Sequence, residues 1–165
     1  MPGKPAARLI DNVIHLPPVL GPGPGSPNVF IGMLPAWRGV PGAVAGALQA
    51  AKQISDTAIQ VAEVATLSAL GTPGFPAAKA AEEATKAAAA AQMGSMITSM
   101  AGGADIHTCA TPLPLPPHGP GVVIDGSQTV FINGLQACRL GDTVLEAVGP
   151  PNKIARGEMT VLIGG

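Results

Sequence analysis

The sequence predicts a mostly β fold of three pseudo-repeated short β-hairpins, with an α-helical hairpin inserted among them. One reason is that a short apolar strand flanked by glycine recurs three times along the chain. Another is that one long, alanine-rich segment has helical periodicity instead. Gly and Pro contribute 22 and 18 of the 165 residues, which favours short strands and tight turns. Because such small units cannot bury their apolar faces alone, we expect the three to pack with pseudo-threefold symmetry.

Each strand unit consists of a turn that contains glycine, then a short strand, then a second turn. They read GSPNVFIG, GSQTVFING and GEMTVLIG, at residues 25–32, 126–134 and 157–164. In two copies an arginine follows the central valine of the strand at the same interval, Val29 to Arg38 and Val130 to Arg139. This equal spacing indicates an internal repeat.

Aspartates recur in register with the same repeat. Three aspartates each lie four residues before a side chain that can bind a metal: Asp11 and His15, Asp105 and Cys109, Asp142 and Glu146. Aspartates in turns commonly accept backbone hydrogen bonds, so we expect a structural role for them. The arginines that we expect to bind turn carbonyls or carboxylates are Arg8, Arg38 and Arg139. Glu146 itself is expected to be an exposed residue.

Residues 40–103 break the repeat and form the predicted insertion. Apolar residues at helical spacing predict a first helix over residues 43–70, the GTPGFP segment at 71–76 ends it, and a second helix runs from 77 to about 100. The longest uncharged stretch is rich in small residues, which argues against a membrane span. We therefore predict a β part at 1–39 and 104–165, with 40–103 as an accessory whose removal has a modest cost.

The segment DIHTCATPLPLPPHGPG, at residues 105–121, holds two of the three histidines and one of the two cysteines. Four prolines lie between Cys109 and His118, which excludes a helix and predicts a stiff, extended loop. His107, Cys109 and His118 are donors of the types that a tetrahedral zinc site uses. Cys138 remains the alternative to Cys109, although a free cysteine after an apolar strand is more often a small core residue.

Charge and composition exclude several classes of function. Nine basic and ten acidic residues, with no Tyr and one Trp, give no basis for binding nucleic acid. The start of the sequence has no apolar segment of a secretory signal, so the two cysteines are expected to be reduced thiols in a cytoplasm.

The motifs described above resemble those of PAAR-repeat proteins, which cap the trimeric VgrG spike of type VI secretion systems and related contractile injection machines. The resemblance rests on PAAR at residues 5–8 followed by Asp11, on the strand units, and on HGPGVVIDGSQTVFING and CRLGD. It implies a small β cone whose broad base sits on the spike, one chain per trimer. It also implies a structural protein, not an enzyme, which is cytoplasmic in the producing bacterium and is then secreted with the spike, meeting a membrane only as a puncturing tip.

The resemblance further implies that the apex of the cone holds one zinc ion through three histidines and a cysteine. Matched motif by motif, the implied ligands are His15, His107, Cys109 and His118. The sequence departs from the family pattern at Leu16 and Pro17, which replace two glycines, and at Trp37 and Cys138, which replace small residues.

Two other functions remain open. A zinc-dependent hydrolase would need an open metal position and a base, for which Glu146 or Asp105 could serve. An effector adaptor or chaperone would use the helical insertion at 40–103, through an apolar face that includes Val44, Leu48 and Val61. A type VI system and a related injection particle are not distinguished by the sequence.

Overall fold

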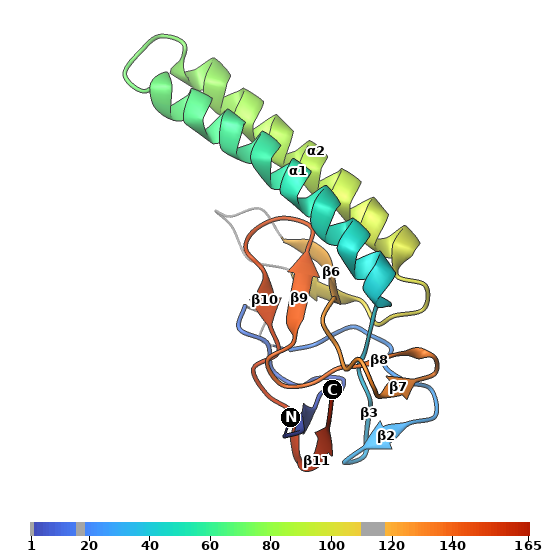
Figure 1. Cartoon of the computed structure of the whole chain (residues 1–165). Coiled ribbons are helices and arrows are strands. Elements are labelled where there is room, and N and C mark those ends of the chain that lie inside the picture. Colours follow the sequence, from blue (N-terminus) through green and yellow to red (C-terminus); the bar gives the residue numbers. More distant parts are fainter. Residues whose placement is uncertain (1, 16–18, 110–117) are drawn as a thin grey trace.

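The computed structural model describes residues 2–15, 19–109 and 118–165, and it consists of a β body from which a long helical hairpin projects (Figure 1). The strands are β1 (Lys4–Ala6), β2 (Phe30–Ile31), β3 (Leu34–Pro35), β4 (Arg38–Gly39), β5 (His107–Cys109), β6 (Gly119–Val123), β7 (Phe131–Ile132), β8 (Leu135–Ala137), β9 (Thr143–Glu146), β10 (Asn152–Lys153) and β11 (Glu158–Ile163). The helices are α1 (Gly42–Ser68) and α2 (Phe75–Met100).

Two of the three repeated strand units form continuous antiparallel hairpins. Strand β2 pairs with β3, and β7 pairs with β8, each across a tight turn with positive φ angles. The third unit differs, because its strand β11 pairs with β1 from the other end of the chain (Figure 1). The third unit is therefore not a hairpin as predicted: its strand forms a two-stranded antiparallel sheet with β1.

A cycle of backbone hydrogen bonds joins the three repeats. Ala7 N donates to Cys138 O at 2.9 Å, Cys138 N to Trp37 O at 3.1 Å, and Trp37 N to Ala7 O at 2.9 Å. All three residues are buried and each immediately precedes an arginine of the repeat. Ala7, Trp37 and Cys138 are therefore equivalent core positions at which the three repeats meet.

Each arginine of the repeat pairs with an aspartate of the repeat. The pairs are Arg8 with Asp11, Arg38 with Asp105, and Arg139 with Asp142. In all three the arginine backbone N also donates to the aspartate Oδ2, at 2.8, 2.7 and 2.8 Å. The prediction that these arginines bind carboxylates is confirmed.

The second pair locates the helical insertion within the repeat. Arg38 and Asp105 are separated by the whole insertion, yet Asp105 N donates to Arg38 O at 3.0 Å, as Asp11 N does to Arg8 O at 3.1 Å. The insertion therefore begins and ends at adjacent points of the β body, between the arginine and the aspartate of the second repeat.

The helices form where the periodicity and the breakers predict them. Helix α1 follows Pro41, α2 has a proline in its first turn, and Gly71 and Gly102 follow the two helix ends. Because α1 and α2 have 27 and 26 residues, the expectation of a mostly β fold applies only outside the insertion. Among the described residues, no helix is long and apolar enough to cross a membrane.

The near ends of the helices share a hydrophobic core with the β body. Leu48, Met93 and Ile97 belong to the same buried cluster as Val122 and Leu145 of strands β6 and β9. Helix α2 packs on β6, which is a middle strand of the four-stranded sheet β10-β9-β6-β5. The insertion is therefore packed onto this sheet along part of its length.

Candidate metal centre

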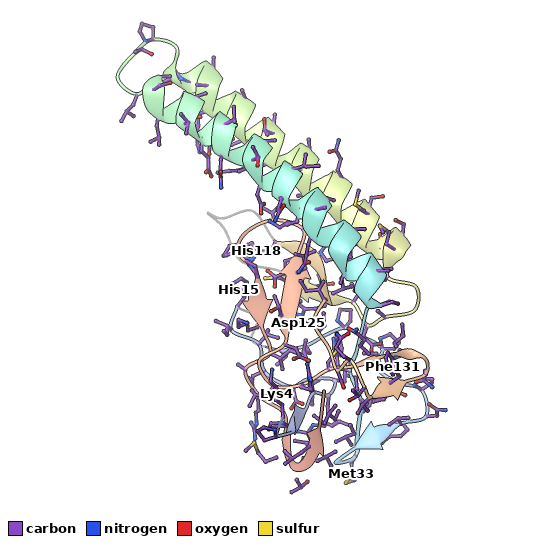
Figure 2. All side chains as sticks on the ribbon, viewed as in Figure 1. Lys4, His15, Met33, His118, Asp125 and Phe131 are labelled. Carbon is purple, nitrogen blue, oxygen red and sulfur yellow. The ribbon has the colours of Figure 1, made fainter. Side chains whose placement is uncertain are left out.

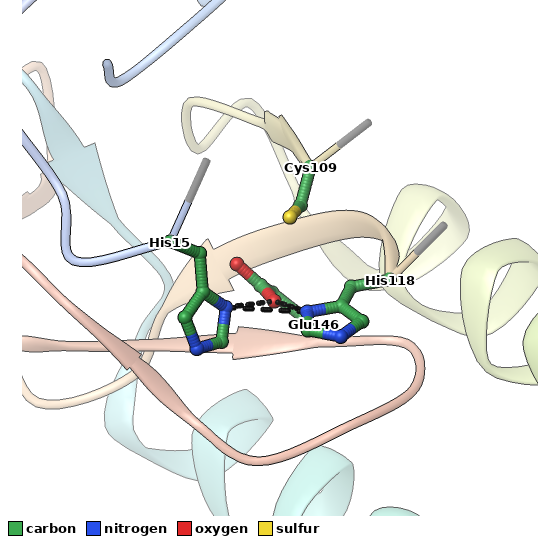
Figure 3. A group of neighbouring side chains, drawn as sticks. All are labelled: His15, Cys109, His118 and Glu146. Atoms are coloured by element: carbon green, nitrogen blue, oxygen red, sulfur yellow. Dashed lines mark hydrogen bonds and ion pairs between the residues drawn. The ribbon is translucent and has the colours of Figure 1, made fainter. Parts of the chain in front are cut away.

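Four potential metal ligands from distant parts of the sequence converge on one side of the β body. They are His15, Cys109, His118 and Glu146, and one ligand atom from each lies within 4.8 Å of the others (Figure 3). Cys109 ends β5, His118 directly precedes β6, and Glu146 ends β9. The pairing of β5 with β6 and of β6 with β9 places these three side chains together.

The repeat explains why three of these residues meet. His15, Cys109 and Glu146 each lie four residues after an aspartate that is paired with its arginine. Because the three arginine–aspartate pairs are equivalent, the residues at equal distance beyond them come together. His118, from the second end of the proline-rich segment, is the fourth member.

Glu146 is buried, so the expectation that it is exposed is wrong. Only 1% of Glu146 is exposed, because its strand β9 lies between β6 and β10 in the sheet. Its Oε2 lies 3.0 Å from His15 Nδ1 and 2.7 Å from His118 Nδ1, and its Oε1 accepts a hydrogen bond of 2.8 Å from Asn152 Nδ2. The spacing of four residues after Asp142 was the signal in the sequence that pointed to Glu146.

His107 occupies a core position beside the group. It lies two residues after Asp105, where the other repeats have the buried valines Val13 and Val144. Its side chain is fully buried, and neither ring nitrogen has a hydrogen-bond partner among the described residues. Its Nε2 lies 3.7 Å from Glu146 Oε1. Burial lowers the pKa of His107, and the Glu146 charge acts against this.

Cys138 lies in a different core cluster from the group of four. Its thiol is fully buried with Ala7, Trp37 and Val123, and burial raises the pKa of this thiol well above its usual value. Of the two cysteines, the structure brings Cys109 to the group. The proline-rich segment at 110–117 and the departures at Leu16 and Pro17 lie outside the described residues.

The donor set fits a small divalent cation. His15 Nδ1 and His118 Nδ1 lie 3.2 Å apart, and both face the same Glu146 oxygen (Figure 3). A carboxylate only accepts hydrogen bonds and a neutral imidazole has one acceptor nitrogen, so atoms this close need protons or a cation between them. Ligand atoms of a tetrahedral zinc site lie about 3.3–3.8 Å apart. The contacts of 2.7, 3.0 and 3.2 Å among Glu146, His15 and His118 would have to lengthen slightly, and all separations in the group are already within 4.8 Å.

Comparison with known proteins adds one finding. Residues 113–165 match a family model described as the PAAR motif. This stretch contains His118, Cys138, Asp142 and Glu146. No curated protein and no solved structure matched the chain.

Proposed function

Because the chain carries a PAAR motif, the mark of proteins at the spike tip of contractile injection systems, we propose that it caps a VgrG-like trimeric spike, one chain per trimer. In this role the protein is a structural cap, and no reaction is assigned to it. It is made in the bacterial cytoplasm and leaves with the spike.

The observation that carries this proposal is an apolar surface with the symmetry of a trimer. Phe30, Phe131 and Leu162 each follow the central valine of a strand unit, and they are 59%, 56% and 60% exposed. The isoleucines that follow them and three alanines of the repeats form one buried cluster, made of two sets of three equivalent residues: Ile31, Ile132 and Ile163, and Ala6, Ala36 and Ala137. A single chain can match a threefold partner over its whole surface only if it repeats its own surface three times.

This apolar surface is the base of the cap. In Figure 2, Met33 lies at the lower end of the β body and Phe131 on its right side, both away from His15 and His118 at the upper left. Met33 and Met159 are 92% and 71% exposed and enlarge the apolar area of the same strand units. An exposed apolar patch of this kind is typical of a protein–protein interface.

We expect the base to bind the spike through these three side chains. Replacing Phe30, Phe131 and Leu162 together by serine should weaken binding to the cognate trimer by about tenfold per residue, since buried aromatic anchors dominate interfaces. Thermal stability should hardly change, because the side chains are already exposed in the free protein. Surface plasmon resonance with immobilised trimer measures the change.

A matched control is the triple serine variant of Ile54, Val61 and Leu67, which are exposed on α1. This variant should bind the trimer like the unmodified protein. If it loses as much affinity as the base variant, the trimer contacts the helices and the proposed orientation is wrong.

We further propose that the group of four holds a zinc ion through His15, Cys109, His118 and Glu146. Zinc supplies a cross-link between the three repeats, and its binding free energy adds to that of folding. Four protein donors fill a tetrahedral site and leave no position for an activated water, which is why the hydrolase alternative is not favoured. In this arrangement His107 packs beneath Glu146 as a core residue and is not a ligand.

Two substitutions distinguish this ligand set from the one implied by family resemblance. His107→Val introduces the residue of the equivalent positions 13 and 144, so it should retain one zinc per chain. Glu146→Gln should weaken zinc binding, because it replaces a carboxylate ligand by a neutral amide. Plasma emission spectrometry of the purified proteins, with chelator competition, measures both. Zinc loss in His107→Val with retention in Glu146→Gln would assign the fourth position to His107.

The helical hairpin is the proposed attachment point for an effector or chaperone. The apolar face expected to bind such a partner included Val44 and Leu48. In the structure Leu48 is fully buried and Val44 packs against the same core. Exposed apolar residues are found farther along α1, where Ile54 and Val61 line a shallow groove of about 640 Å³ with Thr85 of α2.

A further inference from the structure

We propose that the near half of the helical hairpin is the outer wall of the metal centre and positions His118 and Glu146. This inference rests on the proposed metal site and extends it. It assigns Gly94, Ala89 and Ile59 of the helices, and Val148 of the β body, as positioning residues. Metal binding and the packing of the hairpin are then coupled.

The first contact is between α2 and the segment that carries His118. Gly94 is buried on α2, and a Cβ atom at this position would lie 3.3 Å from both Cδ and Cγ of Pro120. Pro120 lies two residues after His118. Helix α2 therefore rests closely on the start of β6, and even a methyl group at Gly94 would be in tight contact with Pro120.

The second contact is between the hairpin and the segment that carries Glu146. The next residue, Ala147, belongs to the core cluster that contains Met93 and Ile97 of α2. The one after it, Val148, forms a separate buried cluster with Ile59 of α1 and Ala89 of α2. Both residues that follow Glu146 are thus held by the helices.

The two ligand-bearing segments are also fixed to each other. Val148 N donates to His118 O and Ala147 N donates to Pro120 O, both at 3.1 Å. Gly149 has a φ of +85°, and a Cβ there would lie 2.8 Å from His118 Nε2. The imidazole therefore lies against the backbone of the turn that the helices hold.

The strand pairing between these segments is equally close. A Cβ at Gly121 would lie 3.0 Å from Glu146 Cγ. A closely packed interior transmits displacements, because no voids absorb them. A shift of α2 toward or away from Pro120 must therefore move the ligand atoms of His118 and Glu146 relative to each other.

Coupling of this kind is reciprocal. If packing of the hairpin orients the ligands, then bound metal must hold the hairpin against the β body by the same free energy. Residues that orient metal ligands typically change metal affinity by 10–100-fold when they are replaced. The distal half of the hairpin, beyond Ile59 and Ala89, makes none of these contacts and should not affect the metal.

The test compares two glycines in the helices. Gly94→Leu should weaken zinc binding at least tenfold, as measured by chelator competition, and should alter the visible spectrum of the Co²⁺-loaded protein. Gly46→Leu is the matched control, because nothing lies within 4 Å of a Cβ at Gly46; it should bind zinc normally. Val148→Ala and the milder Gly94→Ala provide variants that fold even if Gly94→Leu does not.

Hydrogen exchange supplies the reciprocal measurement. Removing zinc from the unmodified protein should accelerate amide exchange around Ile59 and Ala89 more than around the distal Thr66. Normal zinc affinity in folded Gly94→Ala and Val148→Ala, with metal-independent exchange in the hairpin, would overturn the coupling alone. An unmodified protein that binds no zinc would overturn the metal site and the coupling together.

Discussion

Excising residues 40–103 and joining Gly39 to Ala104 is expected to leave a β body that is not stably folded. The excision would uncover Val122, Leu135 and Leu145, which now share a buried core with the helices. Exposing three such side chains costs up to roughly 5–9 kcal/mol. A domain of this size typically has a free energy of unfolding of about 5–15 kcal/mol. Circular dichroism and thermal unfolding of the shortened protein measure the result.

A shorter excision provides the control. Glu63 and Lys86 form an ion pair of 2.7 Å between the helices, so joining Ala62 to Ala87 through a short glycine linker removes only the distal turns. This protein should fold and bind zinc, because Leu48, Ile59, Ala89 and Met93 remain. Equal stability of the two shortened proteins would show that the insertion is the removable accessory predicted from the sequence.

Asp105→Ala is expected to destabilise the protein by about 3–5 kcal/mol, because it leaves a buried arginine without its carboxylate partner. Asp105 is fully buried and accepts hydrogen bonds from Arg38 N, Nε and Nη2, at 2.7, 3.0 and 2.8 Å, and from Gly25 N at 2.9 Å. The contact also brings the two ends of the insertion together. Urea denaturation followed by tryptophan fluorescence measures the loss, since Trp37 directly precedes Arg38 in the core.

The equivalent aspartate of the first repeat is the comparison. Arg8 also forms an ion pair with Glu158, so Asp11→Ala leaves this arginine with one carboxylate partner. Its effect should therefore be clearly smaller than that of Asp105→Ala. If the two losses are equal, the second carboxylate near Arg8 contributes nothing and burial alone determines the cost.

Local patterns allowed the helices and the internal repeat to be predicted. Periodicity and glycine or proline breakers act within a few residues, so the predicted bounds 43–70 and 77–100 lie close to Gly42–Ser68 and Phe75–Met100. Equal spacing in the sequence indicated the repeat, and its arginines were expected to bind turn carbonyls or carboxylates. The pairing of each arginine with an aspartate of the repeat was not predicted and is known from the structure. Periodicity does not reveal what covers an apolar face, so Leu48 was expected at a partner surface and is instead buried in the shared core.

The group of four shows which features of the candidate metal site could not be predicted from the sequence. The burial of Glu146 depends on β10 and β6 lying on either side of β9, which is a tertiary arrangement. His107 stands at the position of Val13 and Val144 in the repeat, which the sequence already allows one to count, but its complete burial is known only from the structure. Family resemblance supplied a ligand pattern, and the structure shows which residues of this chain lie near one another.

The pairing of β1 with β11 has a consequence for the order in which the protein folds. Hairpins β2–β3 and β7–β8 connect neighbouring residues and can form early, because closing a short loop has a small entropic cost. The remaining pair joins Lys4 to Ile163, one of the longest separations in the chain. During synthesis β1 must therefore wait until β11 has left the ribosome, and the apolar surface that includes Leu162 forms after the two hairpins.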